Sequence, residues 1–175
     1  LPLVVVACLL LMGAGRPEPS TRPAAAMSST TAPSSGKHTF VIVHGAWGGG
    51  WAFRQVDQLL TADGHKVFRP TLTGLGERVH LATPDVGLST HIQDVYNAIW
   101  YEDLTDIILV GHSYGGMVVS GVADRMPERI KHLVYLDAFL PSDGQSLFDL
   151  GGGRAGQQSS DWRVPPMPTN EPPDE

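Results

Sequence analysis

A serine between two glycines is the group in this chain best suited to chemistry. Residues 111–115 read Gly-His-Ser-Tyr-Gly, with an apolar run before them and a small apolar stretch after them. A strand, a sharp turn and a helix in this order are typical of a nucleophile elbow, which projects a serine hydroxyl beyond the sheet edge. So tight a turn leaves no room for a Cβ at Gly111 or Gly115. Ser113 is therefore the candidate nucleophile, and a serine that only caps the following helix is the alternative.

A second glycine-rich segment, residues 44–51, follows the apolar run at residues 39–43. Its glycines have the GxxxxG spacing of a phosphate-binding loop. Trp51 and Ala52 stand where that loop needs Lys and Ser or Thr, and no GxGxxG pattern for a dinucleotide is present. The sequence therefore predicts no phosphate or nucleotide cofactor at this loop.

The remaining functional interpretation of this loop is an oxyanion hole. The backbone N–H of Ala46 would point at the same spot as the N–H of Tyr114, the residue after the candidate nucleophile. The alternative is a glycine loop that only lets Trp47 and Trp51 pack. We predict Ala46 and Tyr114 as the oxyanion donors.

Seven histidines compete for the role of general base. Three lie at the starts of predicted strands, at the sheet edge opposite the elbow: His38, His65 and His132. His112 should point away from Ser113 and pack, and His44 should fix the oxyanion loop by hydrogen bonding. His80 and His91 flank the helix before the elbow strand and could line a pocket. No histidine pair has the spacing of a helical metal site, so we predict no metal.

The elements that must position these residues alternate along the chain. Strands are predicted at 39–43, 66–69, 107–110 and 130–136, and helices at 52–62, 90–102 and 116–123. A capping box at Thr90 and Gln93 is predicted to open the middle helix. This alternation predicts an α/β fold with a mostly parallel sheet and helices on both faces.

Composition restricts the partners. The net charge is −6 and no Lys/Arg cluster occurs, which argues against nucleic acid and favours a small molecule. The single cysteine allows no intramolecular disulfide and no CxxC site. Nothing in the sequence predicts an oligomeric state.

The two ends of the chain differ from its middle. Residues 1–15 resemble the apolar part of a secretory signal peptide, and residues up to 37 are expected to be a flexible lead-in. Secretion or export to the periplasm follows from that interpretation, whereas a start at Met27 would make the protein cytoplasmic. The folded part is predicted over residues 38–150, and residues 151–175 are Gly- and Pro-rich.

Four segments together resemble the α/β-hydrolase superfamily: residues 44–47, 71–78, 111–116 and 136–141. The nearest likeness is the branch of bacterial esterases, plant methylesterases of the salicylate-binding type and hydroxynitrile lyases. The resemblance implies a serine esterase acting on small esters, with Ser113 as nucleophile and the N–H groups of Ala46 and Tyr114 as oxyanion hole. A hydroxynitrile lyase, an amide or lactone hydrolase, and a non-catalytic small-molecule-binding protein stay open as alternatives.

One departure from the family pattern concerns the rest of the triad. The family places its acid and then its histidine on later loops, but no histidine follows His132. We therefore expect the acid and the histidine to lie beyond residue 175. The 175 residues would then be an inactive fragment that breaks off inside the cap region, and their sheet would end in an unpaired edge after residue 136. Asp137 is a possible substitute acid, and the alternative is a carboxylate that hydrogen-bonds the turn at residues 138–142.

Overall fold

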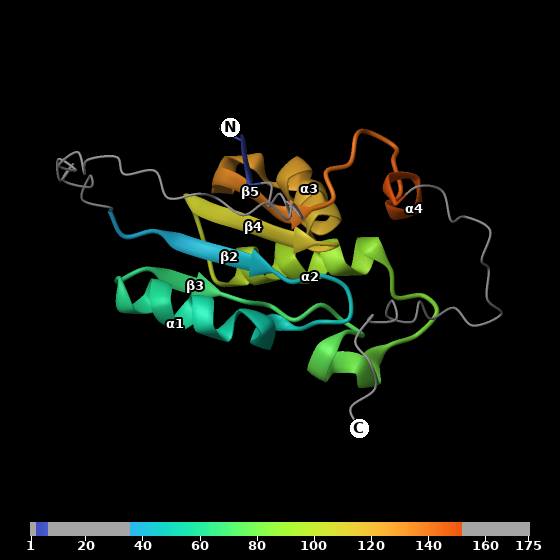
Figure 1. Cartoon of the computed structure of the whole chain (residues 1–175), viewed down its shortest axis with the longest axis horizontal. Coiled ribbons are helices and arrows are strands. Elements are labelled where there is room, and N and C mark those ends of the chain that lie inside the picture. Colours follow the sequence, from blue (N-terminus) through green and yellow to red (C-terminus); the bar gives the residue numbers. More distant parts are fainter. Residues whose placement is uncertain (1–2, 7–35, 152–175) are drawn as a thin grey trace, which may run out of the picture.

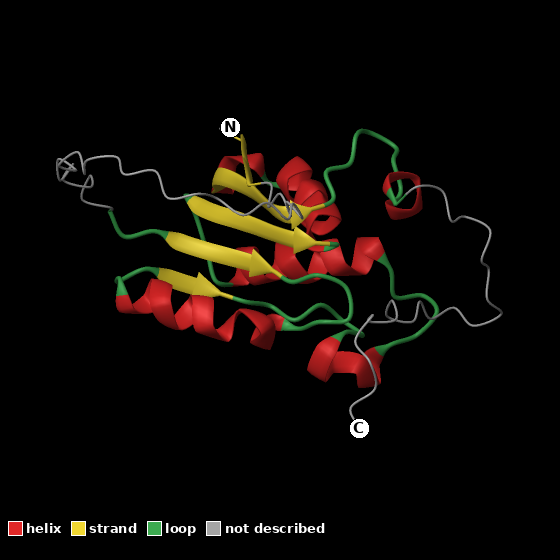
Figure 2. Ribbon diagram, viewed as in Figure 1, coloured by secondary structure: helices red, strands yellow, loops and turns green. Residues whose placement is uncertain are grey.

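The computed structural model describes residues 3–6 and 36–151, and of residues 3–6 only the backbone. A five-stranded sheet forms its centre (Figures 1 and 2). Its strands, in spatial order, are β1 (Leu3–Val6), β5 (Ile130–Ala138), β4 (Ile107–Ser113), β2 (Thr39–Val43) and β3 (Lys66–Phe68). All four pairings are parallel, which confirms the predicted parallel sheet, although β1 was not predicted as a strand.

Helices connect the strands. They are α1 (Arg54–Ala62), α2 (Leu88–Tyr101), α3 (Gly115–Arg125) and α4 (Leu147–Leu150), with 3₁₀ turns η1 (Gly50–Phe53), η2 (Gly76–Leu81) and η3 (Pro127–Arg129). The buried residues of α2 and α3 pack on one face of the sheet. On the other face, Phe53 of η1 contacts the ring of His112, and α1 follows beside β3. Helices therefore lie on both faces.

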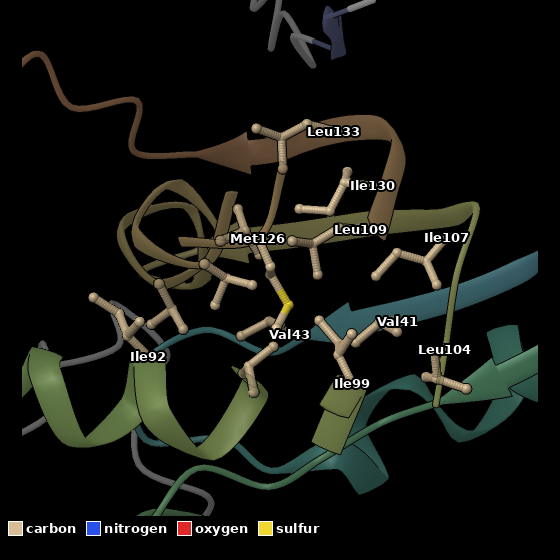
Figure 3. Close-up of a cluster of buried hydrophobic side chains, with 14 of the residues drawn as sticks. Val41, Val43, Ile92, Ile99, Leu104, Ile107, Leu109, Met126, Ile130 and Leu133 are labelled. Carbon is tan, nitrogen blue, oxygen red and sulfur yellow. The ribbon is translucent and has the colours of Figure 1, made fainter. Parts of the chain in front are cut away.

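The core lies between the sheet and the pair α2 and α3 (Figure 3). Val41 and Val43 of β2 and Ile107 and Leu109 of β4 are fully buried there. Every second residue of β4 is buried in this way, because successive side chains of a strand point to opposite faces. Burying one such side chain contributes about 1.5–3 kcal/mol, so this face fixes the register of the central strands.

The start of α2 corrects one prediction. The helix begins at Leu88, with Gly87 as its N-cap and no side chain capping it, so the predicted capping box at Thr90 is wrong. Leu88 packs against the core, which extends the helix by two residues, and Gln93 donates to Asn97 instead of capping. A capping box does occur at α4, between Ser146 and Asp149.

The edge beside β5 also differs from expectation. β1 pairs with β5 in register, with Leu3 opposite Leu133 and Val6 opposite Leu136, so the prediction of an unpaired edge is wrong. The run Leu-Val-Val-Val has the β-branched composition that suits a strand.

The predicted terminal segments lie largely outside the described residues. Most of residues 1–37, and all of the Gly- and Pro-rich tail after residue 151, fall there. The leader and tail assignments therefore stay predictions. Among the described residues, no helix is long and apolar enough to cross a membrane.

Candidate active site

Ser113 is the last residue of β4 and has a left-handed backbone conformation, with φ of 52°. Tyr114 is already helical, and α3 begins at the next residue. Serine rarely adopts a left-handed conformation, and such strain persists only where the surrounding structure imposes it. The strand, turn and helix predicted for a nucleophile elbow are therefore present at Ser113.

The two glycines of the elbow are required by close contacts. A Cβ at Gly111 would lie 2.7 Å from the carbonyl oxygen of Gly115, and one at Gly115 would lie 2.5 Å from that of Val43. Both contacts are with backbone, which cannot move aside as a flexible side chain can. The prediction that both positions must lack a Cβ is confirmed.

The glycine loop after β2 lies against the elbow. A Cβ at Gly45 would come within 3.0 Å of the Cβ of Ser113. Ala46 and Tyr114 line the same cavity, and neither backbone N–H donates a hydrogen bond to another described residue. The structure thus brings the two predicted oxyanion donors together, beside the predicted nucleophile.

The alternative interpretation of this loop was a role in packing two tryptophans. Trp47 is 44% exposed and Trp51 is 52% exposed, so neither ring is enclosed. Trp47 also has a left-handed φ of 60°, although tryptophan gains nothing from that conformation. A Cβ at Gly49 would lie 2.6 Å from Trp51 Nε1, so packing of this ring accounts for that glycine. It does not account for Gly45, which lies against Ser113 instead.

His44 fixes this loop, as predicted from the sequence. Its Nδ1–H donates to the Gly45 carbonyl at 2.7 Å, and its Nε2 accepts the N–H of Leu72 at 3.0 Å. The ring is almost fully buried, and this burial lowers its pKa. A neutral ring with both nitrogens engaged holds the loop in place and is not free to serve as a base.

A second clamp, which no sequence motif predicts, holds the far end of the loop. The Thr71 hydroxyl accepts the N–H of Gly50 at 2.8 Å and donates to Glu77 Oε1 at 2.6 Å. This hydrogen bond is the main cause of the lowered pKa of Glu77. Arg78 Nη1 donates to the Thr71 carbonyl at 2.7 Å. The only signal in the sequence was the family likeness of residues 71–78, which assigned these side chains no role.

The same segment is tied to α2. The Thr73 N–H and hydroxyl donate to the two carboxylate oxygens of Asp94, at 2.7 and 2.9 Å. His91 of α2 bonds the Thr73 carbonyl through Nε2 at 2.9 Å and the Tyr114 hydroxyl through Nδ1 at 2.8 Å. Burial lowers the pKa of His91 and raises that of Tyr114 to about 12. The segment after β3, the helix α2 and the elbow are therefore joined by one network.

A cavity of about 550 Å³ opens beside the elbow. It is lined by Ala46, Trp47, Gly74, Leu75, Val79, Ala82, Val86, His91, Tyr114, Leu147 and Phe148. None of these side chains is an acid, a lysine or an arginine, so the lining favours an uncharged, largely apolar ligand.

The other histidines lie away from this cavity. His80 is exposed on η2 and does not line it, contrary to one predicted possibility, and His112 packs against Phe53. His38 and His65 stack on each other at the amino end of the sheet, with ring centroids 5.5 Å apart. In the described part of the chain, no group of three or more histidine, cysteine or acidic residues could hold a metal ion.

Asp137 lies on a bulge at the end of β5. Ser113 pairs with Ala138 and His112 with Leu136, so Asp137 is an extra residue, with a left-handed φ of 44°. Its exposed carboxylate makes no hydrogen bond to the described turn that follows. The bulge positions the Phe139 N–H to donate to the Ser113 carbonyl at 3.1 Å. Asp137 is therefore beside the elbow, and its role as substitute acid stays a prediction.

Comparison with known proteins agrees with this geometry. The model of the alpha/beta hydrolase family matches residues 40–174. The protein belongs to this family. The match to the alpha/beta hydrolase family includes the glycine loop, the elbow and the strand that carries Asp137.

Several relatives in the alpha/beta hydrolase family are known. A carbendazim hydrolyzing esterase of Nocardioides sp. strain SG-4G is 57% identical over 111 residues, which are 63% of this chain and 46% of the relative. An alpha-hydroxynitrile lyase of Arabidopsis thaliana is 36% identical, over 60% of this chain and 41% of its own. Salicylic acid-binding protein 2 of Nicotiana tabacum is 34% identical, over 61% of this chain and 41% of its own length.

Solved structures of this fold agree. An extracellular alpha/beta-hydrolase from a Paenibacillus species superposes with a TM-score of 0.60 and 38% identity, over 64% of this chain and 45% of that one. Tomato methylketone synthase I with bound 2-tridecanone gives a TM-score of 0.59 and 27% identity, over 70% of this chain and 50% of that one. The chain thus spans about half the length of the relatives it matches.

Proposed function

We propose that the complete protein is a serine carboxylesterase for small, uncharged esters. The observation that carries this proposal is the left-handed Ser113, which stands beside two backbone N–H groups without partners among the described residues and next to a mostly apolar cavity. The names of the relatives support an ester substrate, since one is a carbendazim hydrolyzing esterase and several are methylesterases. A small uncharged acyl or alkyl group suits the lining of the cavity.

In the proposed reaction, Ser113 Oγ attacks the ester carbonyl and gives up its proton to a base. The N–H groups of Ala46 and Tyr114 stabilise the oxyanion of the tetrahedral intermediate. Collapse of the intermediate expels the alcohol, which takes a proton from the same base, and leaves an acyl-enzyme. Water then attacks this acyl-enzyme with the help of the base, releases the acid and restores the serine.

The base is proposed to be a histidine that these 175 residues do not contain. His44 and His91 each have both ring nitrogens hydrogen-bonded, and His80 does not line the cavity. The remaining histidines pack elsewhere or lie at the other end of the sheet. The acid is likewise proposed to lie beyond residue 175, with Asp137 as the substitute within this chain.

Labelling with a fluorophosphonate probe tests the nucleophile. In the complete protein the probe should label Ser113 and no other serine, and the label should disappear in Ser113→Ala. The exposed Ser89, in the first turn of α2, supplies the matched control Ser89→Ala, which should label fully. A label that survives Ser113→Ala would contradict the proposal.

A substrate panel separates the esterase from the lyase named among the relatives. The complete protein should cleave p-nitrophenyl acetate, small methyl esters and carbendazim in preference to amides, and should release no cyanide from an aromatic hydroxynitrile. Cyanide release without ester cleavage would favour the lyase. Equilibrium binding without turnover would favour a receptor.

The 175-residue chain by itself should fail the same tests. Without its imidazole partner the serine loses nearly the whole contribution of the triad, because triad members act as a unit. The probe should therefore label Ser113 in this chain no more than in a denatured control. Multiple turnovers of a simple ester by this chain would instead make His91 or His80 the base.

A further inference from the structure

The wall of the cavity beside Ser113 contains one hydrogen-bonded polar pair, His91 and Tyr114. Eleven described residues line this cavity, and only these two and Trp47 have side chains that form ordinary hydrogen bonds. An indole N–H donates and cannot accept. Any side-chain acceptor that this lining offers to a ligand must therefore come from His91 or Tyr114.

The partners of His91 determine where its proton lies. The Thr73 carbonyl can only accept, so the proton is on Nε2, which donates to that carbonyl at 2.9 Å. In a neutral ring this leaves Nδ1 as an acceptor, and the Tyr114 hydroxyl donates to it at 2.8 Å. Burial lowers the pKa of His91, which keeps the ring neutral near pH 7.

The Tyr114 oxygen consequently has lone pairs to offer but no hydrogen. A phenol without a fixed partner can turn its O–H toward a ligand acceptor or receive a ligand donor. Because the Tyr114 hydroxyl donates to His91, it cannot also donate to a ligand. It can only accept a hydrogen bond from one, unlike the hydroxyl of a tyrosine that has no partner. The bond to His91 also fixes the ring, whose centroid lies 5.7 Å from that of His91 in an edge-on arrangement.

We propose that Tyr114, held by His91, acts as a hydrogen-bond acceptor in the substrate pocket, so that the enzyme prefers esters carrying an O–H or N–H donor near the reacting carbonyl. The donor must be near the carbonyl because Tyr114 supplies both the hydroxyl and the proposed oxyanion N–H. Tyr114 is thus a specificity-determining residue and His91 a positioning residue. The inference rests on the proposed esterase function and adds the substrate class.

The test compares two esters that differ in one donor, methyl mandelate and its methyl ether, methyl α-methoxyphenylacetate. The readout is the ratio of their kcat/KM values in the complete protein. Tyr114→Phe should lower this ratio about 3- to 10-fold, the effect of one neutral hydrogen bond. His91→Leu should lower it at least as far, because a released Tyr114 O–H can donate to the ether oxygen. A purely structural role would reduce both substrates alike and leave the ratio unchanged.

Tyr96 of α2 supplies the matched control, since its ring stacks on Trp100 and its hydroxyl has no hydrogen bond among the described residues. Tyr96→Phe should leave the ratio as in wild type. An unchanged ratio in Tyr114→Phe, in a protein that still cleaves both esters, would overturn this inference and leave the esterase intact.

A second readout does not depend on turnover. If the wild-type protein cleaves neither these two esters nor p-nitrophenyl acetate, the proposed function itself fails. The dissociation constants of both esters for the Ser113→Ala protein, with and without Tyr114→Phe, then still test the acceptor. Tyr114→Phe should change the ratio of the two dissociation constants by the same 3- to 10-fold, the effect of about one neutral hydrogen bond. A ratio that Tyr114→Phe leaves unchanged would overturn the inference.

Discussion

Both ends of the parallel sheet contain residues in the left-handed backbone conformation, but among the described residues other than glycine only the carboxyl end includes residue types besides aspartate. At the carboxyl ends of the strands, left-handed residues are Trp47, Ser113 and Asp137, whereas in the loop leading to the amino end of β4 they are Asp103 and Asp106. Aspartate tolerates this conformation, but tryptophan and serine do so less readily. Backbone strain in unsuited residues thus collects at the end of the sheet where the proposed chemistry takes place, which is the usual sign of a functional constraint.

The histidines at the two ends of the sheet also differ from each other. At the carboxyl end, His44 and His91 are buried, neutral and bonded through both ring nitrogens. At the amino end, His38 and His65 stack against each other and are only partly buried. A residue type alone therefore does not identify a site, whereas full use of its hydrogen-bonding groups in a buried position does.

The largest effect should come from the strained serine. Ser113→Ala in the complete protein should lower kcat/KM for p-nitrophenyl acetate on the order of 10⁴- to 10⁶-fold, because the proposed nucleophile is lost. Asp106→Asn, at the other end of the sheet, keeps a residue that tolerates the left-handed conformation and should leave activity within about twofold of wild type. Equal losses in the two variants would remove the contrast between the ends.

A smaller loss is expected from Gly115→Ala. The added Cβ would lie 2.5 Å from the Val43 carbonyl oxygen, so the elbow and the proposed oxyanion loop would have to separate. Displacing one oxyanion donor typically costs about 10²- to 10³-fold in kcat. Gly36→Ala is the matched control, because nothing lies within 4 Å of a Cβ at that position. Steady-state kinetics and circular dichroism of both variants check this prediction.

Thr71→Val tests the second clamp of the glycine loop after β2. The change leaves the Gly50 N–H without its acceptor and Glu77 without its donor, so the free energy of unfolding should fall by about 1–3 kcal/mol. Thr61→Val is the control, since the Thr61 hydroxyl bonds Asp57 on the exposed side of α1. Its effect should stay within about 0.5 kcal/mol in urea unfolding.

The smallest effect concerns pH. Burial lowers the pKa of His44 and His91 below the ordinary value of 6.5. Below about pH 6.5 the unfolded chain therefore binds more protons at these two rings than the folded protein does. The contribution of each histidine to the free energy of unfolding is fully present above about pH 6.5. It decreases as the pH falls from there to the folded pKa, by at most about 1.4 kcal/mol per pH unit for each histidine. His91→Gln should reduce this slope between about pH 7 and pH 5 in urea titrations. An unchanged slope in His91→Gln would show that this ring is not buried as a neutral base.

The sequence alone determined the strands β2 to β5, the parallel sheet and the position of the elbow, but not the strand β1. These features depend on local patterns, such as continuous apolar runs for buried strands and a glycine on each side of Ser113, and local patterns can be read from neighbouring residues. The role of His44 was also predictable, because it directly precedes the loop that it fixes.

Tertiary structure alone decided how the site is held together. Thr71 bonds Gly50 across 21 positions of the chain, and His91 bonds Tyr114 across 23. Neither spacing follows a helical or strand period, so no sequence pattern indicates the contact. The start of α2 and the bulge at Asp137 were likewise settled by packing, because burying Leu88 and pairing β5 with β4 outweigh the preferences of the residues concerned. Local composition fixes which elements form, and only the packed fold fixes which side chains meet at the end of the sheet.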